Sequence, residues 1–144
     1  MKKFFLIIAV AALTVTMQQA TAQLKLNVNV NLGSQPEWGP AGYDYVEYYY
    51  LPDIKTYYYV PSGQFVYLNN KQWIFSNSLP ARYNSYNLYT GYKVVINESK
   101  PYLRDSVYQS RFARYKGWTG RQKLNSSNAK YKLFNGRGSA LDRN

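Results

Sequence analysis

The chain has 144 residues, with 18 Lys and Arg against 7 Asp and Glu, a formal net charge of +11, 17 Tyr, and neither His nor Cys. Without imidazole or thiol groups, the composition excludes a thiol nucleophile, a histidine base, the common zinc and haem ligands and any disulfide framework. The length fits one domain, and we expect no cofactor, no metal and no enzymatic activity.

The first 22 residues have the three parts of a secretory signal peptide. Lys2 and Lys3 precede an apolar run at residues 4–15, and Ala-Thr-Ala follows at 20–22. The run of 12 residues is shorter than the roughly 20 that cross a bilayer. We therefore expect cleavage before Gln23, export to the periplasm or the cell exterior, and no transmembrane segment in the mature chain.

Residues 23–42 are predicted to form an N-terminal strand and a loop. Apolar and polar residues alternate strictly up to Leu32, and a period of two predicts a strand with one apolar face. The apolar members are Leu24, Leu26, Val28, Val30 and Leu32. A loop containing Pro36, Trp38 and Pro40 follows.

Residues 43–117 are predicted to form a Tyr-rich β-meander domain with a covering helix. Short aromatic and β-branched runs are separated by turn residues at Pro52-Asp53, at 61–63 and at Asn69-Asn70. Short strands with tight connections favour an antiparallel sheet. The predicted strands are residues 45–51, 55–60, 64–68, 71–76 and 93–97.

One helix is expected near the end of this domain. Asp105 or Ser106 can cap a helix that runs to about Lys116 and ends at Gly117. Its apolar face would carry Tyr108, Phe112 and Tyr115. Before it, Tyr recurs every third residue through 83–92, which fits either a turn-rich wrap or a short irregular helix.

The positive charge is concentrated in the last third of the chain. Five basic and five acidic residues cancel between Gln23 and Ser99, whereas eleven basic and two acidic residues lie between Lys100 and Asn144. Large apolar residues are scarce after Gly117, so residues 118–144 are predicted to be a flexible basic tail. The predicted fold is therefore mainly β: a small antiparallel meander of four to five strands, one C-terminal helix and a disordered basic tail.

Rings occupy both faces of the predicted meander, because Tyr48, Tyr49 and Tyr50 alternate along one strand. This pattern fits a self-supporting tyrosine ladder. It also fits an exposed aromatic face that stacks on a sugar ring or on another copy of the sheet. The predicted binding residues are Tyr48, Tyr50, Tyr58, Tyr67 and Trp73 on the sheet, with Arg111, Arg114 and Lys116 on the helix.

These features favour a non-catalytic module of the cell envelope that binds a glycan, peptidoglycan or lipopolysaccharide. The basic stretch with interleaved rings would also suit nucleic acid, but an exported chain does not meet intracellular DNA, so no nucleic-acid partner is expected. The alternative is a structural protein that self-associates through the aromatic face or the 24–32 strand. A third class is a carboxylate-dependent glycan hydrolase. Its candidate carboxylates are Glu37, Asp44, Glu47 and Asp53.

One stretch of sequence resembles a known group of proteins. It reads QPEWGPAGYDYV at 35–46 and YYYLPDI at 48–54, and it closes with Trp73, Leu79-Pro80 and GYKVVI at 91–96. This stretch resembles a family of small exported proteins of Gram-negative bacteria. The resemblance spans about half of the mature chain and implies export and a small Tyr-rich sheet. The function of that family is uncharacterised, so the resemblance implies no active site.

Overall fold

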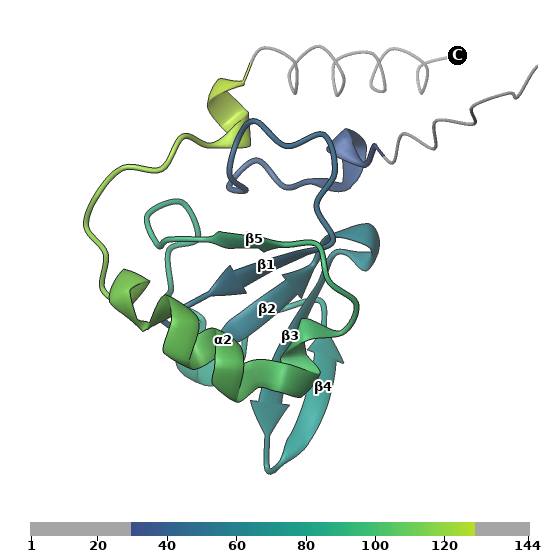
Figure 1. Cartoon of the computed structure of the whole chain (residues 1–144), viewed down its shortest axis with the longest axis vertical. Helices are drawn as coiled ribbons and strands as arrows, with labels where there is room; N and C mark the ends of the chain where they lie inside the picture. The colour runs from purple at the N-terminus through teal and green to yellow at the C-terminus, as the bar shows by residue number, and fades with distance from the viewer. Residues whose placement is uncertain (1–29, 129–144) are drawn as a thin grey trace, which may run out of the picture.

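The computed structural model describes residues 30–128, which form a five-stranded antiparallel sheet with one α-helix (Figure 1). The strand order is β4-β3-β2-β1-β5. The strands are β1 Tyr48–Leu51, β2 Thr56–Tyr59, β3 Gln64–Asn69, β4 Gln72–Ser76 and β5 Val94–Ile96, and the helix is α2 Asp105–Phe112. The predicted mainly β meander with one helix is confirmed. The predicted signal peptide, most of the predicted 23–32 strand and residues 129–144 lie outside the described residues.

The connections between strands follow the turn residues of the sequence. Between β2 and β3, a 3-10 turn at Val60–Ser62 ends at Gly63, which has a φ of +67°. Between β3 and β4, the register pairs Asn69 with Gln72, so the two turn residues are Asn70 and Lys71. Both have positive φ, 47° and 64°, as a tight type I′ hairpin requires. The turn predicted at Asn69-Asn70 is therefore wrong by one residue.

The first face of the sheet, which we call the helix face, carries Tyr48, Tyr50 and Tyr57. It is covered by α2 and the 3-10 turns on either side of it, Pro101–Arg104 and Ala113–Tyr115 (Figure 1). The rings of Tyr102 and Tyr108 from this cover meet Tyr57 edge-on, with centroid distances of 6.5 Å and 6.3 Å. Such ring pairs contribute about 0.5–1.5 kcal/mol each beyond the buried area.

The start of α2 differs from the predicted cap. Asp105 is the first residue of the helix rather than its cap, and Arg104 precedes it without a side-chain capping bond. The Asp105 carboxylate accepts hydrogen bonds from the Tyr57 hydroxyl at 2.8 Å and from the Gln109 side chain. The Asp105 carboxylate therefore bonds to the buried phenol of Tyr57 instead of capping the helix, and this bond joins α2 to β2.

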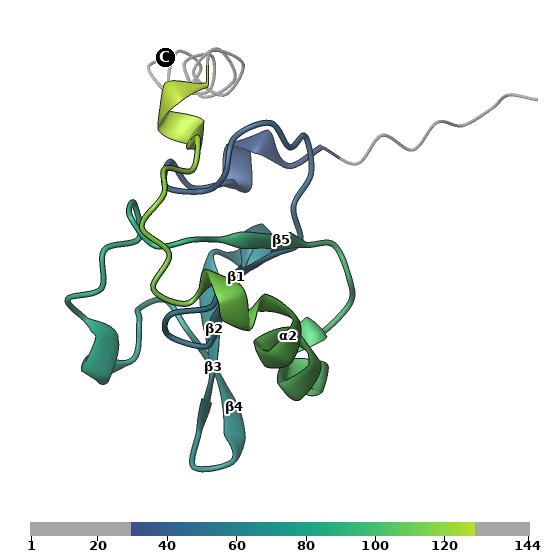
Figure 2. The same cartoon turned by 60° about the vertical axis from the view of Figure 1, so that its left-hand side comes forward.

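The opposite face, which we call the loop face, carries Tyr49, Tyr58 and Phe65 and is covered by irregular segments. Trp38 lies against Tyr58 with a ring-centroid distance of 4.8 Å. The segment between β4 and β5, including the 3-10 turn Ala81–Tyr83, supplies the rest of this cover. Figure 2 shows the sheet between α2 and this teal segment. The 83–92 segment is thus a turn-rich wrap, and β1 is buried from both faces of the sheet.

The C-terminal part of the described chain packs back on the N-terminal loop. Leu124 forms an isolated antiparallel bridge with Pro40. The Asn125 N–H donates to the Gly39 carbonyl at 2.8 Å, and the buried Asn125 side chain donates to the Pro36 carbonyl at 3.1 Å. The remaining 3-10 turns are Leu32–Ser34 and Asn125–Ser127. The predicted flexible tail is therefore wrong for residues 118–128.

Candidate functional site

Two of the predicted binding tyrosines lie in the interior. Tyr48 is 4% exposed and Tyr50 is 1% exposed, both beneath α2 and its flanking turns. A ligand could stack on either ring only if the helix moved away. The expectation that one aromatic face of the meander is open to a flat partner is therefore wrong, because α2 and short irregular segments cover these rings.

The other predicted sheet residues are half-buried. Tyr58 lies under Trp38, and Trp73 packs against Tyr102 with ring centroids 5.4 Å apart. Tyr67 lines a small cavity of about 320 Å³ next to Pro80 and Arg82. The three side chains therefore do not form one platform, since Tyr58 and Tyr67 lie on the loop face and Trp73 on the helix face.

The predicted basic residues are exposed at the C-terminal end of α2 and just beyond it. Arg111, Arg114 and Lys116 are all exposed. The Arg114 guanidinium lies over the ring of Tyr115, 4.9 Å from its centroid, and donates to the Tyr115 hydroxyl at 3.1 Å. Positive charge and aromatic surface therefore meet at this end of the helix.

A cavity of about 650 Å³ lies beside this cationic end. We call it the Trp118 pocket. Its lining residues are Asp53, Tyr89, Thr90, Gly91, Gly117, Trp118, Thr119, Gly120, Arg121 and Gln122. Half of its lining residues belong to the segment 118–122, which was predicted to be part of the flexible tail. The only signals that could have revealed it were Trp118 itself and the glycines on either side.

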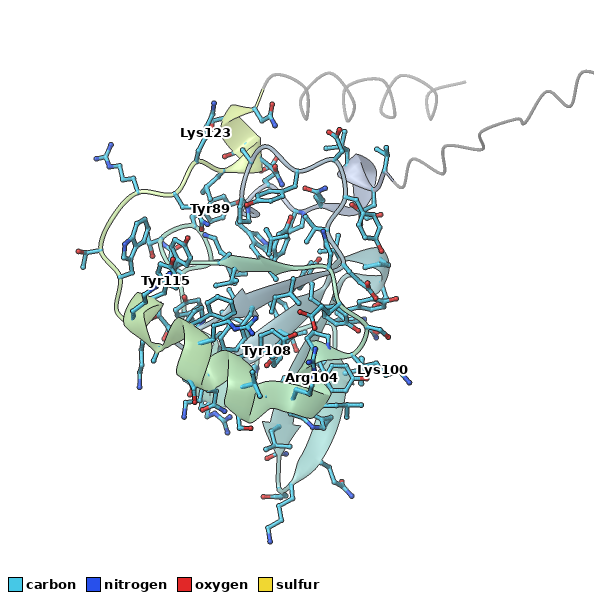
Figure 3. All side chains as sticks on the ribbon, viewed as in Figure 1. Tyr89, Lys100, Arg104, Tyr108, Tyr115 and Lys123 are labelled. Atoms are coloured by element: carbon cyan, nitrogen blue, oxygen red, sulfur yellow. The ribbon has the colours of Figure 1, made fainter. Side chains whose placement is uncertain are left out.

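Aromatic rings form one side of the Trp118 pocket. Trp118 meets Tyr92 edge-on at 4.7 Å, and Tyr92 stacks on Tyr115 at 4.1 Å with an interplanar angle of 6°. Tyr89, on the pocket rim, is 51% exposed. Figure 3 shows Tyr89 and Tyr115 on the same side of the molecule as the loop that carries Lys123. Burial, and then a hydrogen bond with the Tyr115 hydroxyl, raise the pKa of Tyr92, so Tyr92 is neutral at pH 7.

Asp53 anchors the segments that form the pocket. One carboxylate oxygen accepts from the Gly117 N–H at 2.5 Å, and the other accepts from the Tyr86 hydroxyl at 2.8 Å. Burial, and then this hydrogen bond, raise the pKa of Tyr86. The turn after β1, the 83–92 wrap and the end of the helical segment are therefore joined at one carboxylate. Gly91 allows this approach, because a Cβ there would collide with the Tyr86 hydroxyl.

A two-bond clip holds the outer wall of the pocket against the start of β5. The Gln122 side chain donates to the Lys93 carbonyl at 2.8 Å and accepts from the Lys93 N–H at 3.0 Å. Gly120 lies directly against the Trp118 ring, where a Cβ would clash with it. The Lys93 side chain is 1% exposed, and its ammonium group donates to the Leu88 carbonyl at 2.7 Å. Burial lowers the pKa of Lys93 to about 8.

The surroundings of the pocket are strongly cationic. Between Arg111 and Asn128 there are five basic residues and no acidic residue, and Asp53 is the acidic residue in the lining. Arg121 lines the pocket, and Lys123 follows it along the chain. Arg104, by contrast, forms an ion pair with Glu98. The local field therefore favours an anionic ligand.

The candidate carboxylates of the hydrolase hypothesis do not meet in the Trp118 pocket. Asp53 is the one carboxylate among the lining residues, and both of its oxygens accept structural hydrogen bonds. Glu47 and Asp44 lie before β1, and Glu37 lies in the loop that carries Trp38. Within residues 30–128, no group of three or more His, Cys, Asp or Glu side chains is placed to hold a metal ion.

Comparison of the chain with protein-family models, with curated proteins and with solved structures found no match. In the described part of the chain, no helix has the length and apolar character needed to span a bilayer.

Proposed function

We propose that this protein is an exported, non-catalytic module that binds an anionic glycan polymer of the cell envelope in the Trp118 pocket. The observation that carries the proposal is the combination of Trp118, Tyr89 and Arg121 around one cavity of about 650 Å³. A volume of this size accommodates one or two sugar rings, within the range of about 300–1,000 Å³ typical of ligand sites.

The aromatic wall supplies the apolar contact that a sugar ring needs. The C–H groups on one face of a pyranose pack on an aromatic ring, while its hydroxyls reach polar groups at the rim. Trp118 and the exposed Tyr89 provide the rings. Thr90 and Thr119 provide hydroxyls. The site therefore combines a stacking surface with hydrogen-bonding partners, as carbohydrate recognition requires.

The charge around the site favours a polymer that carries carboxylates or phosphates. Arg121 can engage either group with two parallel hydrogen bonds. Arg114, Lys116 and Lys123 extend the positive surface beyond the pocket. Because these side chains are exposed, their attraction is screened within about 8–10 Å at physiological salt. Binding should therefore weaken as the salt concentration rises.

Export is the part of the proposal that rests on sequence alone. Lys2 and Lys3, the apolar run at residues 4–15 and the small residues at 20–22 have the order of a secretory signal. Anionic polymers of the envelope, such as peptidoglycan and lipopolysaccharide, would be available to such a chain. The resemblance to small exported proteins of Gram-negative bacteria supports the same placement.

The proposal is tested by co-sedimentation of the mature chain, residues 23–144, with purified peptidoglycan and with lipopolysaccharide aggregates over a range of NaCl concentrations. Trp118→Ala and Arg121→Gln should each weaken binding about tenfold, which corresponds to about 1.4 kcal/mol. Arg82→Gln is the matched control for the arginine, because Arg82 is exposed and lies over Tyr83 at 5.0 Å, in the wrap far from Trp118 in sequence.

Tyr43→Ala is the matched control for the aromatic residue, since Tyr43 is exposed and does not line the pocket. Equal binding by the Trp118 variant and the parent chain would refute the proposed site. Binding whose strength does not change with NaCl concentration would refute the anionic character of the ligand. Release of soluble sugar fragments, lost on changing Asp53 to Asn, would instead favour the hydrolase.

A further inference from the structure

Strand β4 forms an edge of the sheet that is not protected in the usual ways. It is the terminal strand in the order β4-β3-β2-β1-β5, and among residues 30–128 its ladder partner is β3. Natural edge strands are commonly blocked by a Pro, a charged side chain or a bulge. The sequence from Gln72 to Ser76 contains neither a Pro nor a charge, and its register with β3 is continuous.

The hairpin geometry shows which backbone groups face the open edge. In a two-residue hairpin the residues that flank the turn, here Asn69 and Gln72, form a hydrogen-bonded pair. Pairs then alternate, so Trp73 and Phe75 occupy non-hydrogen-bonded positions with respect to β3. Their N–H and C=O groups therefore point away from β3, toward the place where a further strand would lie.

The two faces of this edge differ in polarity. On the helix face, Leu68 is 42% exposed and Phe75 is 45% exposed. Trp73 lies opposite Leu68 in the register and packs against the ring of Tyr102. On the loop face, β4 presents the polar residues Gln72 and Ser76 at its ends, with the half-buried Ile74 between them. Figure 2 shows the β3–β4 hairpin projecting beyond the other elements. An added strand would therefore fit best with its apolar side on the helix face and its polar side on the loop face.

One segment of the chain has this pattern and lies, apart from Val30, outside the described residues. Residues 24–30 alternate strictly, with Leu24, Leu26, Val28 and Val30 on one side and Lys25, Asn27 and Asn29 on the other. Its seven residues are enough to pair along the five residues of β4. We infer that segment 24–30 of a second copy of this chain adds as a strand to the open edge of β4.

Segment 24–30 is too short to reach β4 of its own chain and still pair along it. Asn31 is fixed near the start of β1, because its N–H donates to the Asp44 carbonyl at 3.0 Å and its side chain bonds both backbone groups of Val46. The position beyond β4 is four strand spacings from β1, or about 19 Å at 4.8 Å each. At about 3.3 Å per residue, crossing that distance uses about six of the seven residues in segment 24–30.

The donor and the acceptor are different surfaces of one chain. Two copies can therefore exchange segments reciprocally and close a dimer, or each can donate to the next and form an open chain. Main-chain hydrogen bonds would supply affinity, and the alternating side chains would supply register, as in other cases of strand addition. This inference is independent of the Trp118 pocket.

The experiment uses the absence of native Cys in the chain. Mature Val28→Cys and Phe75→Cys proteins are purified separately, mixed and treated with a short bis-maleimide. We expect cross-linked dimers in the mixture at about ten times the level given by Val28→Cys mixed with Tyr89→Cys, because pairing raises the local concentration of the two thiols. If Phe75→Cys does not fold, Asn27→Cys with Gln72→Cys tests the opposite face of the same ladder.

Light scattering of the unmodified mature chain should give a mass above that of the monomer that rises with concentration. The Leu26→Asn, Val28→Asn double variant should give the mass of the monomer at all concentrations. A cross-link within one chain in the Val28→Cys, Phe75→Cys double variant would overturn the inference in favour of self-pairing. Homodimers of Phe75→Cys alone would overturn it in favour of β4–β4 pairing. A cross-linking yield equal to that of the Tyr89→Cys control would overturn strand addition itself.

Discussion

The buried ammonium group of Lys93 makes the stability of the fold depend on pH in the alkaline range. Its side chain is 1% exposed and donates to the Leu88 carbonyl at 2.7 Å. Burial lowers its pKa from 10.5 to about 8. Lys93→Met retains the length of the apolar stem and removes the charge, so it isolates the cost of burying the ammonium group.

The sign follows from proton linkage. The folded state binds the Lys93 proton more weakly than the unfolded state, so the fold is destabilised below pH 8 and recovers as the pH rises toward 10.5. A shift from 10.5 to about 8 corresponds to a penalty of up to about 3 kcal/mol at pH 7. Between about pH 7 and 9.5, the free energy of unfolding should rise by about 2 kcal/mol.

Buried phenols set the upper limit of this window. Burial raises the pKa of Tyr48, Tyr50 and Tyr57 above the ordinary value of 10.0, with the Asp105 hydrogen bond as a further cause at Tyr57. Because the pKa of each phenol is higher in the folded state than in the unfolded state, the unfolded chain ionises first as the pH rises. The contribution of these phenols to stability is therefore constant below about pH 10 and is lost above it. Stability should therefore be highest between about pH 9 and 10.

The measurement is urea denaturation followed by tryptophan fluorescence at several values between pH 7 and 9.5. The Lys93→Met chain should show a flat profile in this range. At pH 7 it should be more stable than the parent by about 1–2 kcal/mol, since the lost hydrogen bond to Leu88 offsets part of the gain. Lys116→Met, at an exposed position, is the control and should keep the parent profile.

Two results would refute this reasoning. The first is a parent chain whose free energy of unfolding is constant between pH 7 and 9.5. The second is a Lys93→Met chain that is less stable than the parent at pH 7 but whose free energy of unfolding still rises with pH as in the parent. That result would show that another group titrates in this range and that the charged lysine packs favourably.

Two further predictions concern backbone positions. Gly91→Ala should destabilise the fold by about 1–3 kcal/mol in urea denaturation and weaken polymer binding, because the new methyl group pushes the Tyr86 hydroxyl away from Asp53. Unchanged stability would contradict this, since it would show that the 83–92 segment can move to accommodate the methyl group at no cost. Lys71→Gly should stabilise the fold by about 1 kcal/mol, since a non-glycine residue at a φ of 64° is strained and Asn-Gly suits this turn; a lower thermal midpoint would contradict it.

The strands could be predicted from the sequence because their signals are local. Each run of aromatic and β-branched residues is bounded by residues that favour a turn, such as Pro52 or Gly63. Strands β1, β2, β4 and β5 lie within the predicted ranges, and β3 extends one residue further, to Asn69. The one-residue error at Asn70 arose because two adjacent asparagines tolerate positive φ almost equally. The cap predicted at Asp105 or Ser106 is wrong, because α2 already begins at Asp105 and the Asp105 carboxylate accepts a hydrogen bond from the Tyr57 hydroxyl of β2.

The candidate site was much less predictable, because it depends on contacts between residues far apart in the chain. The composition after Gly117 is typical of a tail, yet a few side chains fix residues 118–128: Trp118 on Tyr92, Gln122 on Lys93 and Asn125 in the N-terminal loop. The average composition of such a stretch hides the contribution of a few single residues. Arg111, Arg114 and Lys116 are exposed, and their role in binding stays a prediction.

The closure of the N-terminal loop by Asn125 has a consequence for the order of folding. The Asn125 side chain bonds partners 89 and 90 residues earlier in the chain. During synthesis, residues 35–39 emerge long before this asparagine, and contacts of such long range form slowly. The meander can pair while the chain is still emerging, but the Trp38 loop must wait for nearly the last segment to arrive. Premature termination near residue 117 would therefore leave an aromatic sheet incompletely covered.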